Sequence, residues 1–141
     1  MARPEVLPAV RGVVLANLPA GLEPARRYQG MTTWVIPAPR SPRTHDGRPL
    51  PVLALGERKA YVSLSIMAFY FVPGFRDRFD ARWRASGCPL DRGQATVRMR
   101  ELDDVPLEVI ADTVAECTVD RVVAAYEQVM AGSLRRFRPV T

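Results

Sequence analysis

The segment Ala60-Tyr-Val-Ser-Leu-Ser-Ile66 alternates apolar and polar side chains. This alternation is typical of a β-strand with one face in the core and the other toward solvent. The segment Ala95–Arg100 repeats the pattern. We therefore predict a core face made of Val62, Leu64, Ile66, Val97 and Met99, and an outer face made of Tyr61, Ser63, Ser65, Thr96, Arg98 and Arg100.

The flanking sequence predicts three more strands and four helices. The strand-like runs are Arg26–Gln29, Thr32–Ile36 and Pro51–Leu55, each bounded by Gly or Pro. Apolar residues at helical spacing predict helices over residues 4–18 and 73–86. They also predict a helix entered through Pro106 and capped by Asp103 or Asp104, and a last one capped by Thr118. This order predicts an α+β fold with an N-terminal helix, about five mostly antiparallel strands in one sheet, and C-terminal helices packed on one face.

Length and composition are typical of one globular domain. The chain has 141 residues, of which 48% are hydrophobic and 25% charged, so extensive disorder is excluded. We expect a single domain over residues 1–131. The basic stretch over residues 132–141 is expected to form a flexible tail.

Several features favour a cytoplasmic protein. Cys88 and Cys117 show no Cys-x-x-Cys spacing, which argues against a disulfide framework or a zinc site. The N-terminal residues lack the apolar core of a signal peptide. The longest uncharged run, Ala60–Phe75, is shorter than the roughly 20 residues of a membrane span.

The positive charge of the chain does not by itself predict a nucleic-acid partner. The net charge is +5, but all basic residues except Lys59 are Arg, a bias typical of GC-rich genomes.

Three segments carry a family resemblance. They are His45-Asp-Gly-Arg-Pro-Leu-Pro-Val-Leu-Ala-Leu55, Lys59-Ala-Tyr-Val-Ser-Leu-Ser-Ile-Met67, and Gly87-Cys-Pro-Leu-Asp-Arg-Gly93 running into Leu102-Asp-Asp-Val-Pro106. They resemble the YdhG-like family of bacterial proteins, the domain of unknown function numbered 1801, over roughly residues 8–130. The resemblance implies an α+β fold in which N- and C-terminal helices pack on a small antiparallel sheet. Some members are likened to frataxin and described as iron chaperones, so it also implies iron delivery as an alternative function.

The outer face of the predicted sheet is the first candidate site. Its residues are Lys59, Tyr61, Ser63, Ser65, Arg98 and Arg100. Guanidinium groups suit carboxylates and phosphates, and hydroxyl groups can orient an anion. We therefore predict a non-enzymatic binding module for a small anion or a protein partner, with the solvated side of a sheet as the alternative interpretation. An open sheet face or edge strand would also allow a homodimer.

An acidic series is the second candidate site. Asp104, Glu108, Asp112 and Glu116 recur at fourfold spacing, which places them on one helical face. Carboxylate oxygens suit hard cations, so this ridge could hold iron loosely. The alternative is a solvated helix face whose first acids complement the helix dipole. No cofactor is otherwise required.

The inventory of reactive residues disfavours an enzyme. His45 is the only histidine and lies in the proline-rich segment 37–50, which argues against a nucleophilic triad. Cys88 stands near Arg82, Arg84 and Arg92 in sequence, and cations could activate its thiol. The alternatives are an ordinary loop thiol and, for His45, a turn residue. A thiol-dependent enzyme using Cys88 is therefore the third hypothesis.

Overall fold

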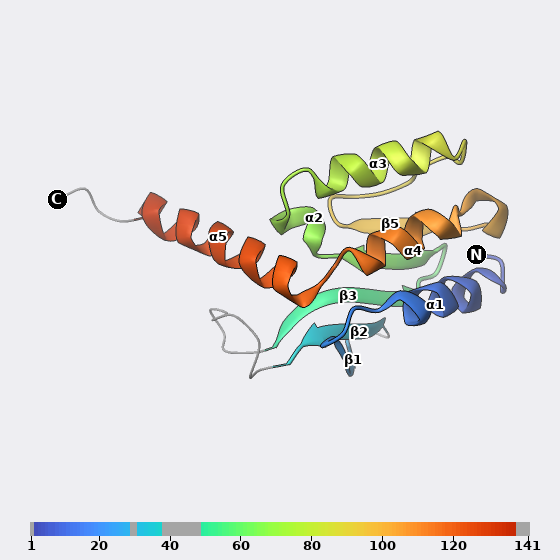
Figure 1. The fold of residues 1–141 in the computed structure, drawn as a ribbon. Helices are drawn as coiled ribbons and strands as arrows, with labels where there is room; N and C mark the ends of the chain where they lie inside the picture. The colour runs from blue at the N-terminus through green and yellow to red at the C-terminus, as the bar shows by residue number, and fades with distance from the viewer. Residues whose placement is uncertain (1, 29–30, 38–48, 138–141) are drawn as a thin grey trace.

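The computed structural model describes residues 2–28, 31–37 and 49–137, and its centre is one antiparallel sheet (Figure 1). The strands lie side by side in chain order, as a meander. They are β1 (Glu23–Tyr28), β2 (Met31–Ile36), β3 (Leu50–Glu57), β4 (Val62–Ile66) and β5 (Thr96–Met99). All five predicted strands are confirmed, with boundaries shifted by a few residues.

The helices pack on one face of this sheet, as predicted (Figure 1). They are α1 (Val6–Asn17), α2 (Ala68–Phe71), α3 (Phe75–Ala85), α4 (Leu107–Ala115) and α5 (Val119–Phe137), with a short 3-10 helix, η1 (Leu102–Asp104). The sequence pattern did not predict α2 and η1, because a single turn is too short for helical periodicity to appear. The fold is therefore α+β.

The predicted core face of the central strands is confirmed. The five residues assigned to the core face are all buried. They pack against the buried stripes of α1 (Val6, Val10, Val14) and of α3 (Phe75, Phe79, Trp83). The indole N–H of Trp83 donates to the carbonyl of Pro89 at 2.9 Å, so the polar atom of this buried ring has a hydrogen-bond partner.

The helices that follow β5 differ in detail from the prediction. Neither Asp103 nor Asp104 caps α4, because both lie in η1 and Pro106 precedes the helix. The Thr118 hydroxyl does cap α5, accepting a hydrogen bond from the Arg121 amide at 3.3 Å.

The C-terminal boundary of the last helix was predicted too early. Helix α5 continues through Phe137, so residues 132–137 are helical, whereas the prediction placed them in a flexible tail. Residues 138–141 of that predicted tail lie outside the described part of the chain. Within the described residues, no helix is long and apolar enough to cross a membrane.

Candidate anion-binding surface

The outer-face residues form rows that cross the strands. Gly56, Ser63 and Arg98 are direct neighbours on β3, β4 and β5. The next row is Ala54, Ser65 and Thr96, in which the two hydroxyl oxygens lie 3.2 Å apart. Small side chains therefore make the floor of this face.

Arg98 and Arg100 flank this floor at the edge strand, and Asp91 holds both of them. The Arg98 amide donates to the Asp91 carbonyl at 2.9 Å, which places the aspartate beside β5. One Asp91 carboxylate oxygen accepts from Nη1 of Arg98 at 2.9 Å and the other from Nη1 of Arg100 at 2.5 Å. The two guanidinium groups are thus fixed by a shared carboxylate.

Tyr61 completes this cluster. Its ring centroid lies 5.9 Å from the guanidinium carbon of Arg98 and 5.6 Å from that of Arg100, within cation–π range. The hydrogen bonds from Arg100 and then Arg98 hold the pKa of Asp91 below its ordinary value. The carboxylate is therefore ionised at neutral pH, and the cluster of Tyr61, Asp91, Arg98 and Arg100 carries a net charge of about +1.

The candidate residues of this face differ in accessibility. Arg98 and Arg100 keep 33% and 49% of their side-chain surface exposed, so both can reach a ligand. Lys59 is exposed in the turn between β3 and β4. Ser63 is buried, which corrects the expectation that it is a solvent-facing ligand residue. It lies between Gly56 of β3 and Arg98 of β5.

Sequence reasoning missed Asp91. It stands outside the alternating strand pattern, in the segment that turns back into β5. The Gly93 amide donates to Thr96 at 2.8 Å in this turn, so Asp91–Gly93 pairs with the edge of β5. The available signal was Asp91-Arg-Gly93, a turn sequence directly before a strand that carries two arginines.

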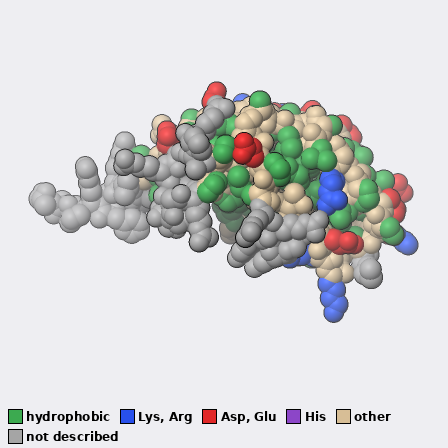
Figure 2. Space-filling model, turned by 90° about the horizontal axis from the view of Figure 1, so that it is seen from below, with side chains coloured by type: hydrophobic (Ala, Val, Ile, Leu, Met, Phe, Trp, Pro, Cys, Tyr) green, Lys and Arg blue, Asp and Glu red, His purple; other side chains and the backbone are tan. Residues whose placement is uncertain are grey.

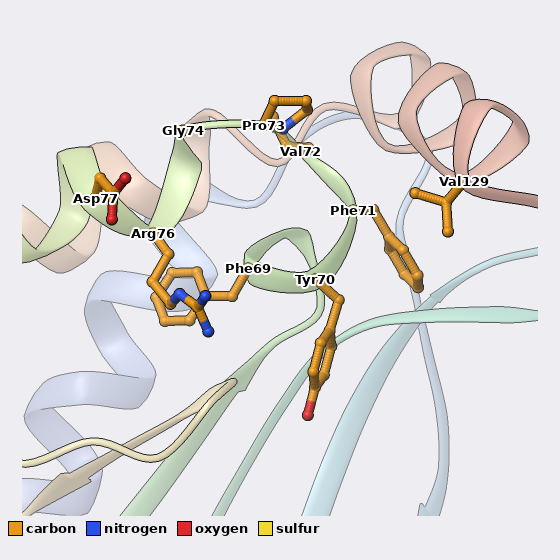
Figure 3. A pocket seen from close by; sticks show the side chains of 9 residues that line it. All are labelled: Phe69, Tyr70, Phe71, Val72, Pro73, Gly74, Arg76, Asp77 and Val129. Atoms are coloured by element: carbon orange, nitrogen blue, oxygen red, sulfur yellow. The ribbon is translucent and has the colours of Figure 1, made fainter. Parts of the chain in front are cut away.

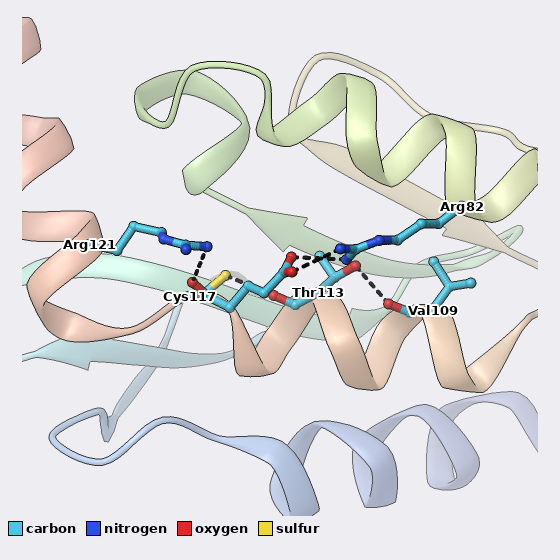
Figure 4. Close-up of polar contacts among 6 residues, drawn as sticks. Arg82, Val109, Thr113, Cys117 and Arg121 are labelled. Carbon is cyan, nitrogen blue, oxygen red and sulfur yellow. Dashed lines mark hydrogen bonds and ion pairs between the residues drawn. The ribbon is translucent and has the colours of Figure 1, made fainter.

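The structure does not assemble the acidic series into a metal site. Asp104 lies in η1, outside the helix that carries Glu108 and Asp112. Both Glu116 carboxylate oxygens accept from Arg82, at 2.9 and 3.0 Å (Figure 4). Within residues 2–28, 31–37 and 49–137, no three His, Cys, Asp or Glu side chains come together in a geometry that could hold a metal ion.

The candidate thiol has few of the neighbours that the sequence suggested. Cys88 is half-buried, and its sulfur lies 3.8 Å from the carbonyl of Asp103. Arg82 binds Glu116, and Arg92 forms a bidentate pair with Asp80. Two of the three expected arginines are therefore engaged with carboxylates, and the third, Arg84, is exposed on α3. His45 lies outside the described residues.

Comparison with protein families, with curated proteins and with solved structures found no match for this chain. On the face shown in Figure 2, the described basic side chains are separated by hydrophobic and acidic ones. Among the described side chains of that face there is no continuous basic surface of the kind that holds a phosphate backbone. The cluster of Tyr61, Asp91, Arg98 and Arg100 is therefore the candidate site.

Proposed function

We propose that this protein is a non-enzymatic binding module whose outer sheet face holds a small anion or an acidic group of a protein partner. The observation that carries the proposal is the fixing of Arg98 and Arg100 by Asp91 beside the ring of Tyr61. Both guanidinium groups remain partly exposed next to a floor of small side chains. An incoming carboxylate or phosphate can therefore reach groups whose orientation is already set.

The negative charge of Asp91 should affect the affinity for different anionic ligands. Asp91 neutralises part of the charge of the two arginines, so a free inorganic anion gains little Coulomb energy there. A larger partner can in addition contact Tyr61 and the half-buried side chains of Ala54 and Ser65. We therefore expect an acidic peptide to bind more tightly than inorganic phosphate.

The test is a titration with inorganic phosphate and with a poly-glutamate peptide, followed by isothermal calorimetry. Arg98→Ala should weaken peptide binding at least fivefold. Asp91→Asn should tighten phosphate binding, because it removes the internal carboxylate and raises the net charge of the cluster by one. Arg84→Ala on α3 is the matched control, since Arg84 is exposed and the charge change is the same.

Two outcomes contradict the proposal. One is a wild-type protein that binds neither probe. The other is equal weakening by Arg84→Ala and Arg98→Ala, which would indicate general attraction by net charge. Opposite effects of Asp91→Asn and Arg98→Ala support a site at this cluster.

The other functions that the sequence left open gain less support from the geometry. Iron delivery would need carboxylates that converge, and Glu116 is held by Arg82. A thiol enzyme would need a base or cations directed at Cys88, whose described sulfur contact is a backbone carbonyl. Membership of the YdhG-like family is likewise our proposal, supported by the three sequence segments that resemble it.

A further inference from the structure

The carboxylate of Asp91 occupies the position in which a ligand would contact both arginines of the outer sheet face. One of its oxygens accepts a hydrogen bond from Arg98 at 2.9 Å and the other from Arg100 at 2.5 Å. Each guanidinium group thus directs a nitrogen at the same carboxylate. A ligand carboxylate that bridges the two arginines in this way must take the place of Asp91.

The backbone around Asp91 is held from two sides. The Asp91 carbonyl accepts a hydrogen bond from the Arg98 amide at 2.9 Å. The next residue, Arg92, forms its bidentate ion pair with α3. Arg76 of α3, which also lines the surface groove shown in Figure 3, donates to the carbonyl of Gln94 at 3.4 Å. The segment that carries Asp91 is therefore fixed to both α3 and β5.

The side chain of Asp91 can leave the arginines without movement of this backbone. It is 44% exposed, so rotation about its Cα–Cβ bond brings the carboxylate into solvent. Among the described residues, its side-chain hydrogen bonds are those with Arg98 and Arg100, and water can replace both. The two guanidinium groups keep their contacts with the ring of Tyr61 when the aspartate turns away.

We infer, given the binding function proposed above, that Asp91 is an internal competitor whose carboxylate exchanges with a carboxylate of the ligand between Arg98 and Arg100. Asp91 is attached beside the arginines, so its effective concentration there is on the order of millimolar or higher. A single free carboxylate at lower concentration therefore does not displace it. A partner with clustered Asp or Glu side chains does, because further carboxylates reach the exposed Lys59 and rebind when one is lost. The ligand class is thus an acidic protein segment rather than a small carboxylate.

The first test is a calorimetric titration of the full chain with a poly-glutamate peptide. Asp91→Ala should bind the peptide at least about tenfold more tightly than the wild type, because no internal carboxylate has to be displaced. Glu101→Ala is the matched control, since Glu101 follows Arg100 in sequence, is exposed and gives the same change of charge. It should change the affinity by less than about twofold at physiological ionic strength, which screens exposed charges.

Replacement of the missing carboxylate by formate is the second test. Formate has the size of the group that Asp91→Ala removes, so it can bridge Arg98 and Arg100 in that variant. Formate should therefore raise the melting temperature of Asp91→Ala more than that of the wild type, relative to chloride at the same ionic strength. Adding Arg98→Ala to Asp91→Ala should abolish this difference, because one of the two donors is then absent.

Failure of the competitor role and failure of the binding function give different results. If neither the wild type nor Asp91→Ala binds the peptide, the proposed function is wrong and the competitor role with it. If the wild type binds and Asp91→Ala binds no more tightly, the binding function stands and Asp91 is not a competitor. Equal tightening by Asp91→Ala and Glu101→Ala also overturns the competitor role, because net charge then accounts for the effect. Circular dichroism of each variant confirms that its fold is retained.

Discussion

Arg82 on α3 donates two hydrogen bonds to the carboxylate of Glu116 at the end of α4, at 3.0 and 2.9 Å (Figure 4). The residues are far apart in sequence, so the pair links two helices that lie side by side over the sheet. Arg121 adds a contact of 3.4 Å to the Glu116 carbonyl at the start of α5. The Arg82–Glu116 pair and the Arg121 contact therefore hold α3, α4 and α5 together where they meet.

Removing this pair should cost little stability at neutral pH. Both side chains are about one-third exposed, and ion pairs of that kind contribute about 0.5–1 kcal/mol. We therefore expect Arg82→Ala to lower the free energy of unfolding by about that amount, as measured by urea denaturation. A double-mutant cycle with Glu116→Gln isolates the pair, and additive effects of the two substitutions would show that the pair contributes nothing.

The contribution of the same pair should depend on pH in a defined direction. The hydrogen bonds and the positive charge of Arg82 lower the pKa of Glu116 from its ordinary value of 4.5. The stabilisation is therefore fully present above pH 4.5 and is lost as the pH falls through the lower pKa of the folded state. The stability difference between wild type and Glu116→Gln should shrink between pH 7 and pH 3, and a constant difference would contradict this assignment.

A more buried ion pair should contribute more. Arg92 forms a bidentate pair with Asp80, whose side chain is only 11% exposed, and this pair fastens the segment after α3 to that helix. Asp80→Ala leaves the Arg92 charge without its partner, so we expect a loss of about 2–3 kcal/mol in urea denaturation. Asp112→Ala, at an exposed position on α4, is the control and should change stability by less than about 0.5 kcal/mol. Equal losses for the two variants would contradict the importance of the buried pair.

Gly56 should not tolerate a side chain. A Cβ at this position would lie 2.7 Å from Cγ and 3.1 Å from Cα of Met31 on the neighbouring strand. Gly56→Ala should therefore destabilise the protein by about 1–3 kcal/mol, since the strands must move apart.

A double-mutant cycle with Met31→Ala tests this explanation, because the alanine side chain has no Cγ. In a Met31→Ala background the Cγ contact is absent, so adding Gly56→Ala should cost clearly less than it does in the wild type. The measurement is the midpoint of urea unfolding for the four proteins of the cycle. An equal cost in both backgrounds would show that Met31 is not the obstacle.

The two cysteines should differ strongly in reactivity. Cys117 is fully buried, and burial, with a smaller effect of Glu116, raises the pKa of its thiol to about 12. Cys88 is half-buried and in partial contact with solvent. Alkylation by iodoacetamide at pH 8, followed by mass spectrometry, should modify Cys88 alone while the protein is folded and both residues in urea. Modification of Cys117 in the folded protein would contradict the packing around α4.

The sequence was sufficient to predict the strands, the longer helices and the side of the sheet that faces the core. These features depend on the spacing of apolar residues within a segment, as in Val62, Leu64 and Ile66 or in Phe75, Phe79 and Trp83. Such spacing is local, because each side chain's direction follows from the dihedral angles of its own element. The arginines of the outer face were found for the same reason.

The tertiary structure decided which charged groups meet. Asp91 contacts Arg98 and Arg100 because the segment after α3 pairs with the edge of β5. Glu116 forms an ion pair with Arg82 because α3 packs beside α4, so its carboxylate does not join the other acidic residues of the series. These contacts join residues from different elements, and their geometry depends on how whole elements pack, which local periodicity does not encode.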